Sequence, residues 1–326
     1  MNISENALNA LAIKEYKGIG RAWIFKHLRG GESLEQLVGL LNSKSKQERR
    51  VTEAEFYTVR ETIRTQIQAK AHCLTGVVGL GDAHFPAVRG QVKNSEQPVA
   101  LFYRGDLNLL HRNSRNIAVI GLLQPDPDTV EREAHMVAAL VAQGAVIVSG
   151  LALGCDTVGH VQALRSGGKT VAILPSTLDA ILPSENRDLA DQIVQQGGLL
   201  VTEYFQPTRS PMEQSSRYQE RDRLQALFSD CVVLSASYAK NEQGLDSGSR
   251  LAMGYAQNYG IKRALMYDAA TDAHNPKFDL NRQFMREQPD IIVVPRYFNN
   301  EQINAIFSVT ANTTTGSIPQ SQGALF

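Results

Sequence analysis

Short apolar segments alternate with segments of helical length from Ile117 to about Pro295. The expected strands are Ile117–Gly121, Ala145–Ser149, Thr170–Leu174, Leu199–Glu203, Cys231–Ser235, Arg263–Tyr267 and Ile291–Val294. Continuous apolar strands joined by crossovers long enough for a helix are typical of a parallel sheet with helices on both faces. In such sheets ligands bind at the carboxyl ends of the strands. The pattern therefore predicts an α/β fold: an extended Rossmann-like, doubly wound and mostly parallel sheet.

The flanking regions have different patterns. Residues 1–70 place apolar residues at helical spacing and contain no strand-like run, so we expect a small helical domain of the SAM or helix-hairpin-helix type. Residues 71–115 are rich in glycine and proline, and we expect a connector that packs on the core. The sheet domain is placed at residues 116–300. The remaining tail, 301–326, is polar and low in complexity and is expected to be disordered from about residue 311.

The composition is that of a soluble folded protein. The chain has 326 residues, 43% of them hydrophobic, with no apolar run of membrane-spanning length and no signal-peptide layout. Cys73, Cys155 and Cys231 are scattered and lack metal-ligand spacing, as expected for reduced thiols. We therefore expect a cytoplasmic protein without a membrane partner, metal, cofactor or structural disulfide.

The formal net charge is zero, so any nucleic-acid site must be local. Residues 1–70 contain twelve Lys or Arg against eight Glu and no Asp, a surplus of four positive charges. Within this region Gly18-Ile19-Gly20 separates two helical patterns, as in a helix-hairpin-helix, where the amides of Gly18 and Gly20 approach a DNA phosphate. A tight turn between two helices, in which the glycines only permit the bend, fits equally well.

A glycine-rich segment, Ser149–His160, directly follows the second expected strand. Gly150 and Gly154 allow a tight turn, and Asp156 or Thr157 can cap the helix that follows. The unpaired N–H groups at such a helix start favour phosphate. An ordinary β-to-α turn has the same features, so the glycines alone leave both interpretations open.

Three expected helix starts meet at the carboxyl ends of the strands if the sheet winds normally. They lie after Gly150, near Ser184–Asn186, and at Ser247-Gly248-Ser249, and each offers amides and a hydroxyl to a phosphate. Near a helix start Arg221 and Arg223 can reach a phosphate, although an internal ion pair, for example with Glu203, is at least as plausible for one of them. The residues predicted to bind phosphate are Ser149, Gly150, Gly154, Arg187, Arg217, Arg221, Arg223, Ser247, Gly248, Ser249 and Arg250.

Other residue types are weaker candidates for function. Asp156 and His160 share a helix face at a spacing that suits a metal pair, but a helix cap and a packed imidazole are the simpler roles. Tyr204, Phe205 and Tyr218 can stack on a nucleobase, although sheet cores of this kind also bury aromatic residues.

Several segments resemble, in the same order along the chain, motifs of the DprA/Smf family of DNA-processing proteins. They are His84–Pro86, Pro98–Gly105, Ile117–Gly121, Ser149–His160, Leu182–Asn186, Thr202–Tyr204, Tyr218–Arg223 and Ser247–Ser249. The longest, SGLALGCDTVGH, is similar to the SGLAxGID…AH signature of that family. The resemblance covers roughly residues 70–268 and implies the same sheet fold.

The resemblance implies a non-enzymatic protein that binds single-stranded DNA, forms a homodimer and delivers DNA to a RecA-type recombinase. DprA-like chains also occur beside toxins in mobile-element defence modules, so an antitoxin or regulatory partner of a cognate toxin is a second hypothesis. A third is an enzyme that cleaves nucleoside monophosphates, as in the related LOG family. The glutamate-bearing loop of that family is absent here, and Glu203 would have to replace it.

The chain departs from the family where cations are expected. The first family strand ends in Gly-Ser-Arg, but here Gly121 is followed by Leu122 and Leu123. A lysine that often follows the proline of the YPxxN motif is Ser184 in this chain. Each charge-assisted contact is worth roughly 1.5–3 kcal/mol, so the two losses imply weaker DNA binding. Either Arg187, Arg217 and Arg250 compensate, or the pocket takes a smaller ligand or has lost its function.

Overall fold

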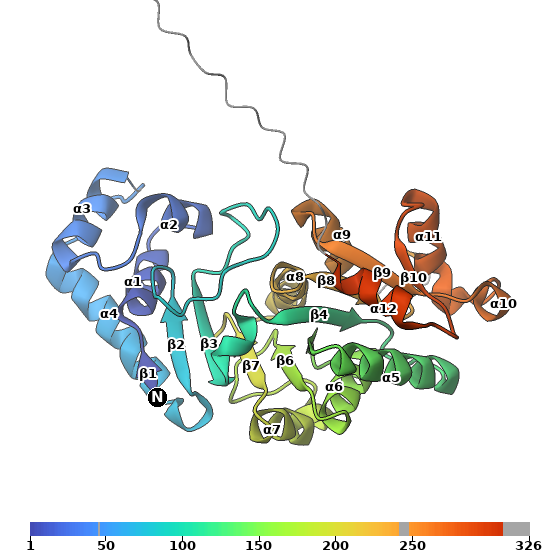
Figure 1. Cartoon of the computed structure of the whole chain (residues 1–326). Helices are drawn as coiled ribbons and strands as arrows, with labels where there is room; N and C mark the ends of the chain where they lie inside the picture. The colour runs from blue at the N-terminus through green and yellow to red at the C-terminus, as the bar shows by residue number, and fades with distance from the viewer. Residues whose placement is uncertain (45, 241–247, 309–326) are drawn as a thin grey trace, which may run out of the picture.

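The computed structural model describes residues 1–44, 46–240 and 248–308. Ten strands in these residues form one sheet in the order β1-β2-β3-β7-β6-β5-β4-β8-β9-β10 (Figure 1). They are β1 (Asn2–Ile3), β2 (Gly76–Gly79), β3 (Ala100–Gly105), β4 (Arg115–Ile120), β5 (Ala145–Ser149), β6 (Lys169–Ile173), β7 (Leu199–Thr202), β8 (Cys231–Leu234), β9 (Lys262–Met266) and β10 (Ile292–Val294). All seven strands expected from the sequence are present, with ends within about two residues of those predicted.

The strands from β7 to β10 in this order are all parallel, whereas β3 pairs antiparallel with β7 and with β2. The predicted fold class, a Rossmann-like and mostly parallel α/β sheet, is confirmed. Two expectations were wrong in detail. Residues 71–115 are more than a connector because β2 and β3 extend the sheet, and residues 1–70 contain the short strand β1. β2 and β3 pair antiparallel and need no helical crossover, and β1 has only two residues, so these strands lack the repeat by which the others were predicted.

Twelve α-helices of the described residues surround the sheet. They are α1 (Glu5–Lys14), α2 (Arg21–His27), α3 (Leu34–Lys44), α4 (Glu53–Gln68), α5 (Pro127–Ala142), α6 (Cys155–Arg165), α7 (Arg187–Gln195), α8 (Pro211–Leu227), α9 (Ser249–Tyr259), α10 (Ala269–Asp272), α11 (Asp279–Glu287) and α12 (Asn300–Phe307). Helices α1–α4 lie together at the β1–β3 end of the sheet (Figure 1). None of the described helices is long and apolar enough to cross a bilayer.

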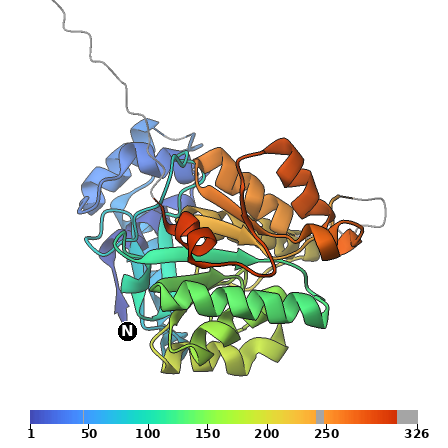
Figure 2. The same cartoon turned by 45° about the vertical axis from the view of Figure 1, so that its right-hand side comes forward.

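Alternate residues of β4 show how the helices cover two faces of the sheet. Ile117 and Val119 join an apolar cluster with residues of α5 and α12, whereas Ala118 and Ile120 join one with α8, α9 and α11. Side chains of successive strand residues point to opposite faces, so a strand buried on both sides is apolar throughout. Helices α5 and α6 lie side by side on the first face (Figure 2).

Helix α8 forms one wall of the site described below. Ser210 caps it by accepting a hydrogen bond from the Glu213 backbone N–H, and Pro211 occupies its first turn. Its C-terminal half, from Arg221 to Leu227, is buried. The segment predicted as a tail contains α12, whose Ile303 and Ile306 pack against the sheet, and the disorder expected from residue 311 concerns residues outside those described. The domain boundaries remain predictions.

Candidate nucleic-acid interface

The glycine-rich turn after β5 is closed from within by Asp156. Its Oδ2 accepts hydrogen bonds from the backbone N–H groups of Gly150, at 3.1 Å, and Ala152, at 3.2 Å. The expectation that Asp156 caps the helix was therefore wrong, because Gly154, with φ of 75°, occupies the cap position without a side-chain hydrogen bond. The Gly150 amide, which was predicted to bind phosphate, and the neighbouring Ala152 amide are thus satisfied inside the protein.

The three predicted helix starts do converge on this turn. The Asn186 side-chain amide donates to Leu151 O at 2.8 Å and to Thr157 Oγ1 at 2.9 Å, which ties the start of α7 to the turn. From the start of α9, Ser249 Oγ donates to Gly121 O, directly after β4, at 3.2 Å. Ser247, also predicted to take part, lies outside the described residues.

A cavity of about 290 Å³ opens where these elements meet. It is lined by Ile120, Gly121, Leu123, Ala152, Asp156, Tyr218, Arg221, Asp222, Gln225, Gly248 and Ser249. The chain adds β5, β6 and β7 on one side of β4 and then returns to add β8 on the other side, so the strand order reverses between β4 and β8. The cavity lies at the carboxyl end of β4, beside this reversal, which is where open α/β sheets bind ligands.

Arg221 crosses the turn and is held between two carboxylates. Its Nη1 lies 3.4 Å from Asp156 Oδ2, its Nε lies 3.3 Å from Asp222 Oδ1, and its side chain is only 7% exposed. A Cβ atom on Gly150 would lie 1.0 Å from the Arg221 Nη1, so only glycine leaves room for this guanidinium. Burial raises the pKa of Asp222 to about 7; Arg221 opposes this shift, and Asp156 adds to it.

Two side-chain donors of residues that line the cavity make no hydrogen bond within the described part of the chain, although neither donor atom is itself exposed. They are Arg221 Nε, which is not oriented to hydrogen-bond with Asp222, and Gln225 Nε2; both residues are buried. An unsatisfied buried donor costs about 1–3 kcal/mol. A ligand in the cavity would recover this cost where the side chain turns its donor toward it.

Two other arginines predicted to bind phosphate are engaged in internal contacts. Arg223 pairs with Glu203 and also donates to the Glu96 backbone carbonyl. Arg217 pairs with Glu213 at 2.6 Å, and its guanidinium lies 4.1 Å from the centre of the Tyr204 ring. Residues two apart on a helix do not share a face, so Arg221 reaches the cavity whereas Arg223 does not line it.

The remaining predicted ligands are more peripheral. Ser149 is buried, and its hydroxyl donates to Val119 O at 2.7 Å, so it is used inside the sheet. Arg187 is exposed at the first residue of α7, and Arg250 is half-buried in the first turn of α9. Leu123, which stands where the family pattern has arginine, is 58% exposed and lines the cavity.

The weaker candidates have distinct surroundings. His160 is buried with Nδ1 2.7 Å from Thr170 Oγ1, and burial lowers its pKa to about 4, consistent with the expected packed imidazole. Phe205 stacks on Phe102, while Tyr218 lines the cavity. The residues described include no group of three or more His, Cys, Asp or Glu arranged to hold a metal ion.

Asp222 and Gln225 were missed as site residues. A signal for them exists in the sequence, because Tyr218, Arg221, Asp222 and Gln225 follow the three- and four-residue spacing of one helix face. The prediction for this segment concerned its arginines and aromatic residues, so the polar neighbours of Arg221 on the same face were left out.

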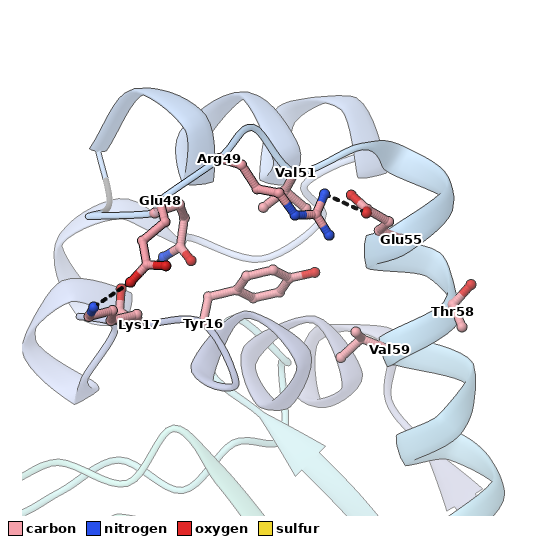
Figure 3. A pocket seen from close by; sticks show the side chains of 9 residues that line it. Tyr16, Lys17, Glu48, Arg49, Val51, Glu55, Thr58 and Val59 are labelled. Atoms are coloured by element: carbon pink, nitrogen blue, oxygen red, sulfur yellow. Dashed lines mark hydrogen bonds and ion pairs between the residues drawn. The ribbon is translucent and has the colours of Figure 1, made fainter.

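A larger hollow of about 710 Å³ lies among the N-terminal helices (Figure 3). Tyr16 lies between two ion pairs there, Lys17–Glu48 at 2.7 Å and Arg49–Glu55 at 2.6 Å. Lys17 and Arg49, which line this hollow, are thus paired with carboxylates. The lining of the hollow includes no strand end of the parallel sheet. The predicted hairpin residues Gly18, with φ of 80°, and Gly20 are nearby and exposed. We place the candidate site at the cavity on the sheet.

Comparisons with known proteins agree with this architecture. The chain matches the family model of DNA recombination-mediator protein A over residues 76–279. It is 33% identical over 149 residues to the DNA processing protein DprA of Streptococcus pneumoniae, covering 46% of this chain and 50% of that protein. It is 29% identical over 161 residues to the protein Smf of Borreliella burgdorferi, covering 47% and 49%. The matched region thus spans about half the length of these relatives.

Solved structures extend the likeness of fold. DNA processing protein A of Streptococcus pneumoniae superposes with a TM-score of 0.68 at 22% identity, over 93% of this chain and 98% of that one. DNA processing protein A of Helicobacter pylori, solved to describe its single-stranded DNA binding mode, gives a TM-score of 0.52 at 27% identity, over 64% and 87%. Since the family model covers more than half of the chain and its fold is the same, this protein belongs to the DNA recombination-mediator protein A family, also called DprA/Smf.

Proposed function

We propose that this protein binds single-stranded DNA at the cavity beside β4 and acts in DNA processing and recombination without catalysis. The observation that carries the proposal is the cavity where the strand order reverses, lined by Arg221 and Gln225, each of which has a buried side-chain donor without a hydrogen bond among the described residues. Family membership and the described DNA binding of the Helicobacter pylori relative support the same class of ligand.

The chemistry of the cavity favours a nucleobase over a phosphate. Arg221 faces two carboxylates, Asp156 and Asp222, so the cavity has no excess positive charge to hold a phosphate. A nucleobase is uncharged and has ring acceptors for Gln225 and Arg221 as well as N–H or carbonyl groups for Asp222. Tyr218 adds an aromatic surface to the wall. We therefore propose that an unstacked base enters the cavity while the phosphates stay outside it.

The phosphates then need cations on the rim, where this chain has few. Leu123 and Ser184 stand where the family pattern has arginine and lysine. Arg187 and Arg250, at the starts of α7 and α9, are the proposed replacements. With fewer phosphate contacts, we expect binding that is weaker than is usual for this family and less dependent on salt.

Fluorescence anisotropy with labelled oligothymidylate at two salt concentrations tests the proposal, and Gln225→Met is the sharpest variant. The Gln225 Nε2 has no hydrogen-bond partner among the described residues, so loss of this amide should leave the unfolding midpoint unchanged or raised. We expect the affinity to fall by about tenfold, corresponding to one lost hydrogen bond. Absence of binding by the natural chain, or equal binding by Gln225→Met, would contradict the proposal.

Binding of a protein partner is a second candidate function. Leu123, Leu153 and Leu182 are exposed apolar residues in the loops that follow β4, β5 and β6. Exposed apolar residues near a site favour a protein partner, which fits the hypothesis of an antitoxin bound to a cognate toxin. A pull-down with the protein encoded by the adjacent gene tests it. The homodimer and the RecA-type recombinase remain predictions of the family resemblance.

The third hypothesis, cleavage of nucleoside monophosphates, required Glu203 to act as the catalytic carboxylate. Glu203 is 7% exposed and is held by Arg21, at 3.3 Å, and by Arg223. It does not line the cavity. The geometry therefore gives this hypothesis no support.

A further inference from the structure

A cluster of charged side chains joins the N-terminal helices to the sheet region. We call it the latch: Arg21, Glu203, Glu220 and Arg223. Arg21, the first residue of α2, has its Nη2 3.3 Å from Glu203 Oε2 and also pairs with Glu220. Arg223 pairs with Glu203 from the other side. The contacts bridge segments 182 and 199 residues apart in the sequence.

The latch is charge-balanced and mostly buried. It contains two guanidinium groups and two carboxylates, with side-chain exposures of 17% for Arg21, 7% for Glu203, 36% for Glu220 and 3% for Arg223. Burial raises the pKa of Glu220, but the hydrogen bond and charge of Arg21, together with the charges of Arg223 and Lys14, lower it by more, so the pKa lies below its ordinary value. Removing one member of a buried charged cluster leaves its partner unpaired, so the arrangement is held firmly.

The latch and the cavity share one helix. Glu220 lies on α8 between Tyr218 and Arg221, both of which line the cavity. A helix moves as a stiff unit over such a short distance, so the contact that fixes Glu220 also fixes the cavity wall. Tyr204 O–H, 3.5 Å from Glu220 Oε2, adds a further contact from the segment after β7.

We propose that Arg21 is a positioning residue for nucleic-acid binding: from the N-terminal helices it holds α8 through Glu220 and Glu203, and so sets the place of Tyr218 and Arg221 in the cavity wall. Arg21 does not line the cavity itself. The N-terminal helices therefore contribute to the site without contacting the base. The part of this inference that concerns DNA rests on the proposed function.

Hydrogen exchange of the DNA-free chain tests the latch independently of any ligand. In Arg21→Met, we expect the amides of residues 218–225 on α8 to exchange about tenfold faster than in the natural chain. Arg64→Met is the matched control, because Arg64 pairs with Glu5 and Glu61 inside the N-terminal helices and should leave α8 unchanged. Unchanged exchange on α8 in Arg21→Met, or an equal effect in the control, would overturn the proposal.

Anisotropy with oligothymidylate then separates positioning from direct contact. We expect Arg21→Met to bind about tenfold more weakly, with an unchanged slope of log affinity against log salt. A slope reduced by about 0.7 would mean that Arg21 contacts a phosphate directly, and unchanged affinity would mean that the latch does not serve the site; either overturns the inference. Arg21→Lys, which keeps one ion pair, should restore part of the affinity.

The two experiments distinguish a failure of the latch from a failure of the proposed function. If the natural chain binds no single strand but Arg21→Met still loosens α8, the latch is supported and the proposed function fails. If Arg21→Met does not fold, Glu220→Gln is the substitute, because Glu220 is more exposed than its partners. The double variant Arg21→Lys/Glu220→Gln then tests whether the two residues act through one contact. If they do, its loss of affinity should be smaller than the losses of the two single variants multiplied together. A loss equal to that product would overturn the inference.

Discussion

Helix α8 carries two charged clusters that differ in one respect. In the latch, two guanidinium groups meet two carboxylates, and Arg223 also donates to a backbone carbonyl. In the cavity, one guanidinium, that of Arg221, lies between Asp156 and Asp222, and the Nε2 donor of Gln225 has no partner among the described residues. The four latch side chains carry equal numbers of positive and negative groups, whereas the cavity has two carboxylates for one guanidinium and an amide donor without a partner among the described residues.

Structural and functional charges in a chain with no net charge can be separated by how the charges within each cluster are balanced. Burial alone does not distinguish them, because Arg221 and Arg223 are both more than nine-tenths buried. The balance of charges does, whereas unpaired donors do not, because the Nε groups of Arg21 and Arg223 in the latch also lack a hydrogen bond among the described residues. A buried charge that its neighbours balance serves the fold, and an unbalanced cluster that lines a cavity is a candidate to meet a ligand.

The largest expected effect is on the stability of the fold and concerns the latch. We expect Arg223→Met to lower the free energy of unfolding by about 3 kcal/mol, because it removes a buried partner of Glu203. Arg221→Met should cost less at pH 7, since Asp222 can take up a proton there. Urea unfolding of both variants measures the contrast. Equal losses would remove the distinction between the clusters.

The next largest effect is on the affinity for single-stranded DNA and concerns the cavity. Leu123→Arg returns a cation to the rim of the cavity, and we expect single strands to bind about tenfold more tightly. Tyr297→Arg adds the same charge at another exposed position, outside the cavity lining, and serves as the control. Anisotropy at constant salt measures both. Gains of the same size would indicate a general charge effect and no site at the cavity.

Titration of Asp222 should be visible as a difference in pH dependence. Its folded pKa of about 7 lies above the ordinary value of about 3.9, so the folded chain keeps a proton that the unfolded chain loses. Its contribution to stability is complete below pH ~4 and is lost as the pH rises through 7.

We therefore expect the stability of the natural chain relative to Asp222→Asn to fall by up to about 1.4 kcal/mol per pH unit between pH 5 and 7. Glu133, whose burial raises its pKa to about 8, titrates in both proteins, so the difference isolates Asp222. Unfolding series at several pH values provide the measurement. Parallel curves would show that Asp222 is charged throughout.

The smallest effect is expected at the exposed pair Lys17–Glu48, beside the N-terminal hollow, whose side chains are 71% and 82% exposed. Exposed ion pairs contribute little, so Lys17→Met should leave the unfolding midpoint within experimental error. Oligothymidylate affinity should also stay the same. A clear loss of affinity would move the nucleic-acid interface toward the N-terminal helices.

The sequence predicts the parallel part of this fold well because each strand there is apolar and is followed by a helical segment. Ala145–Ser149 matches β5 at both ends. β2 and β3 escape the same reasoning, because they pair antiparallel with each other and an antiparallel pair needs no crossover helix. Pairing of β3 with β7 is a long-range contact that no local pattern encodes.

At the candidate site, the sequence predicts which helix starts lie close together. It does not predict which charged side chains pair with one another. Convergence of the turn after β5 with the starts of α7 and α9 follows from the topology of a doubly wound sheet. Internal use of the turn amides by Asp156, and of Arg223 by Glu203, depends on side-chain geometry across distant segments. The contact of Arg21 with Glu203 has no local signal in the sequence.

Photo-crosslinking with an oligonucleotide that carries 4-thiothymidine, followed by peptide mapping, tests the central claim most directly. A base that enters the cavity lies against Tyr218 and Gln225, so we predict crosslinks within the α8 segment 218–225, reduced in Gln225→Met. Crosslinks confined to the N-terminal helices around Tyr16, with none on α8, would contradict the account.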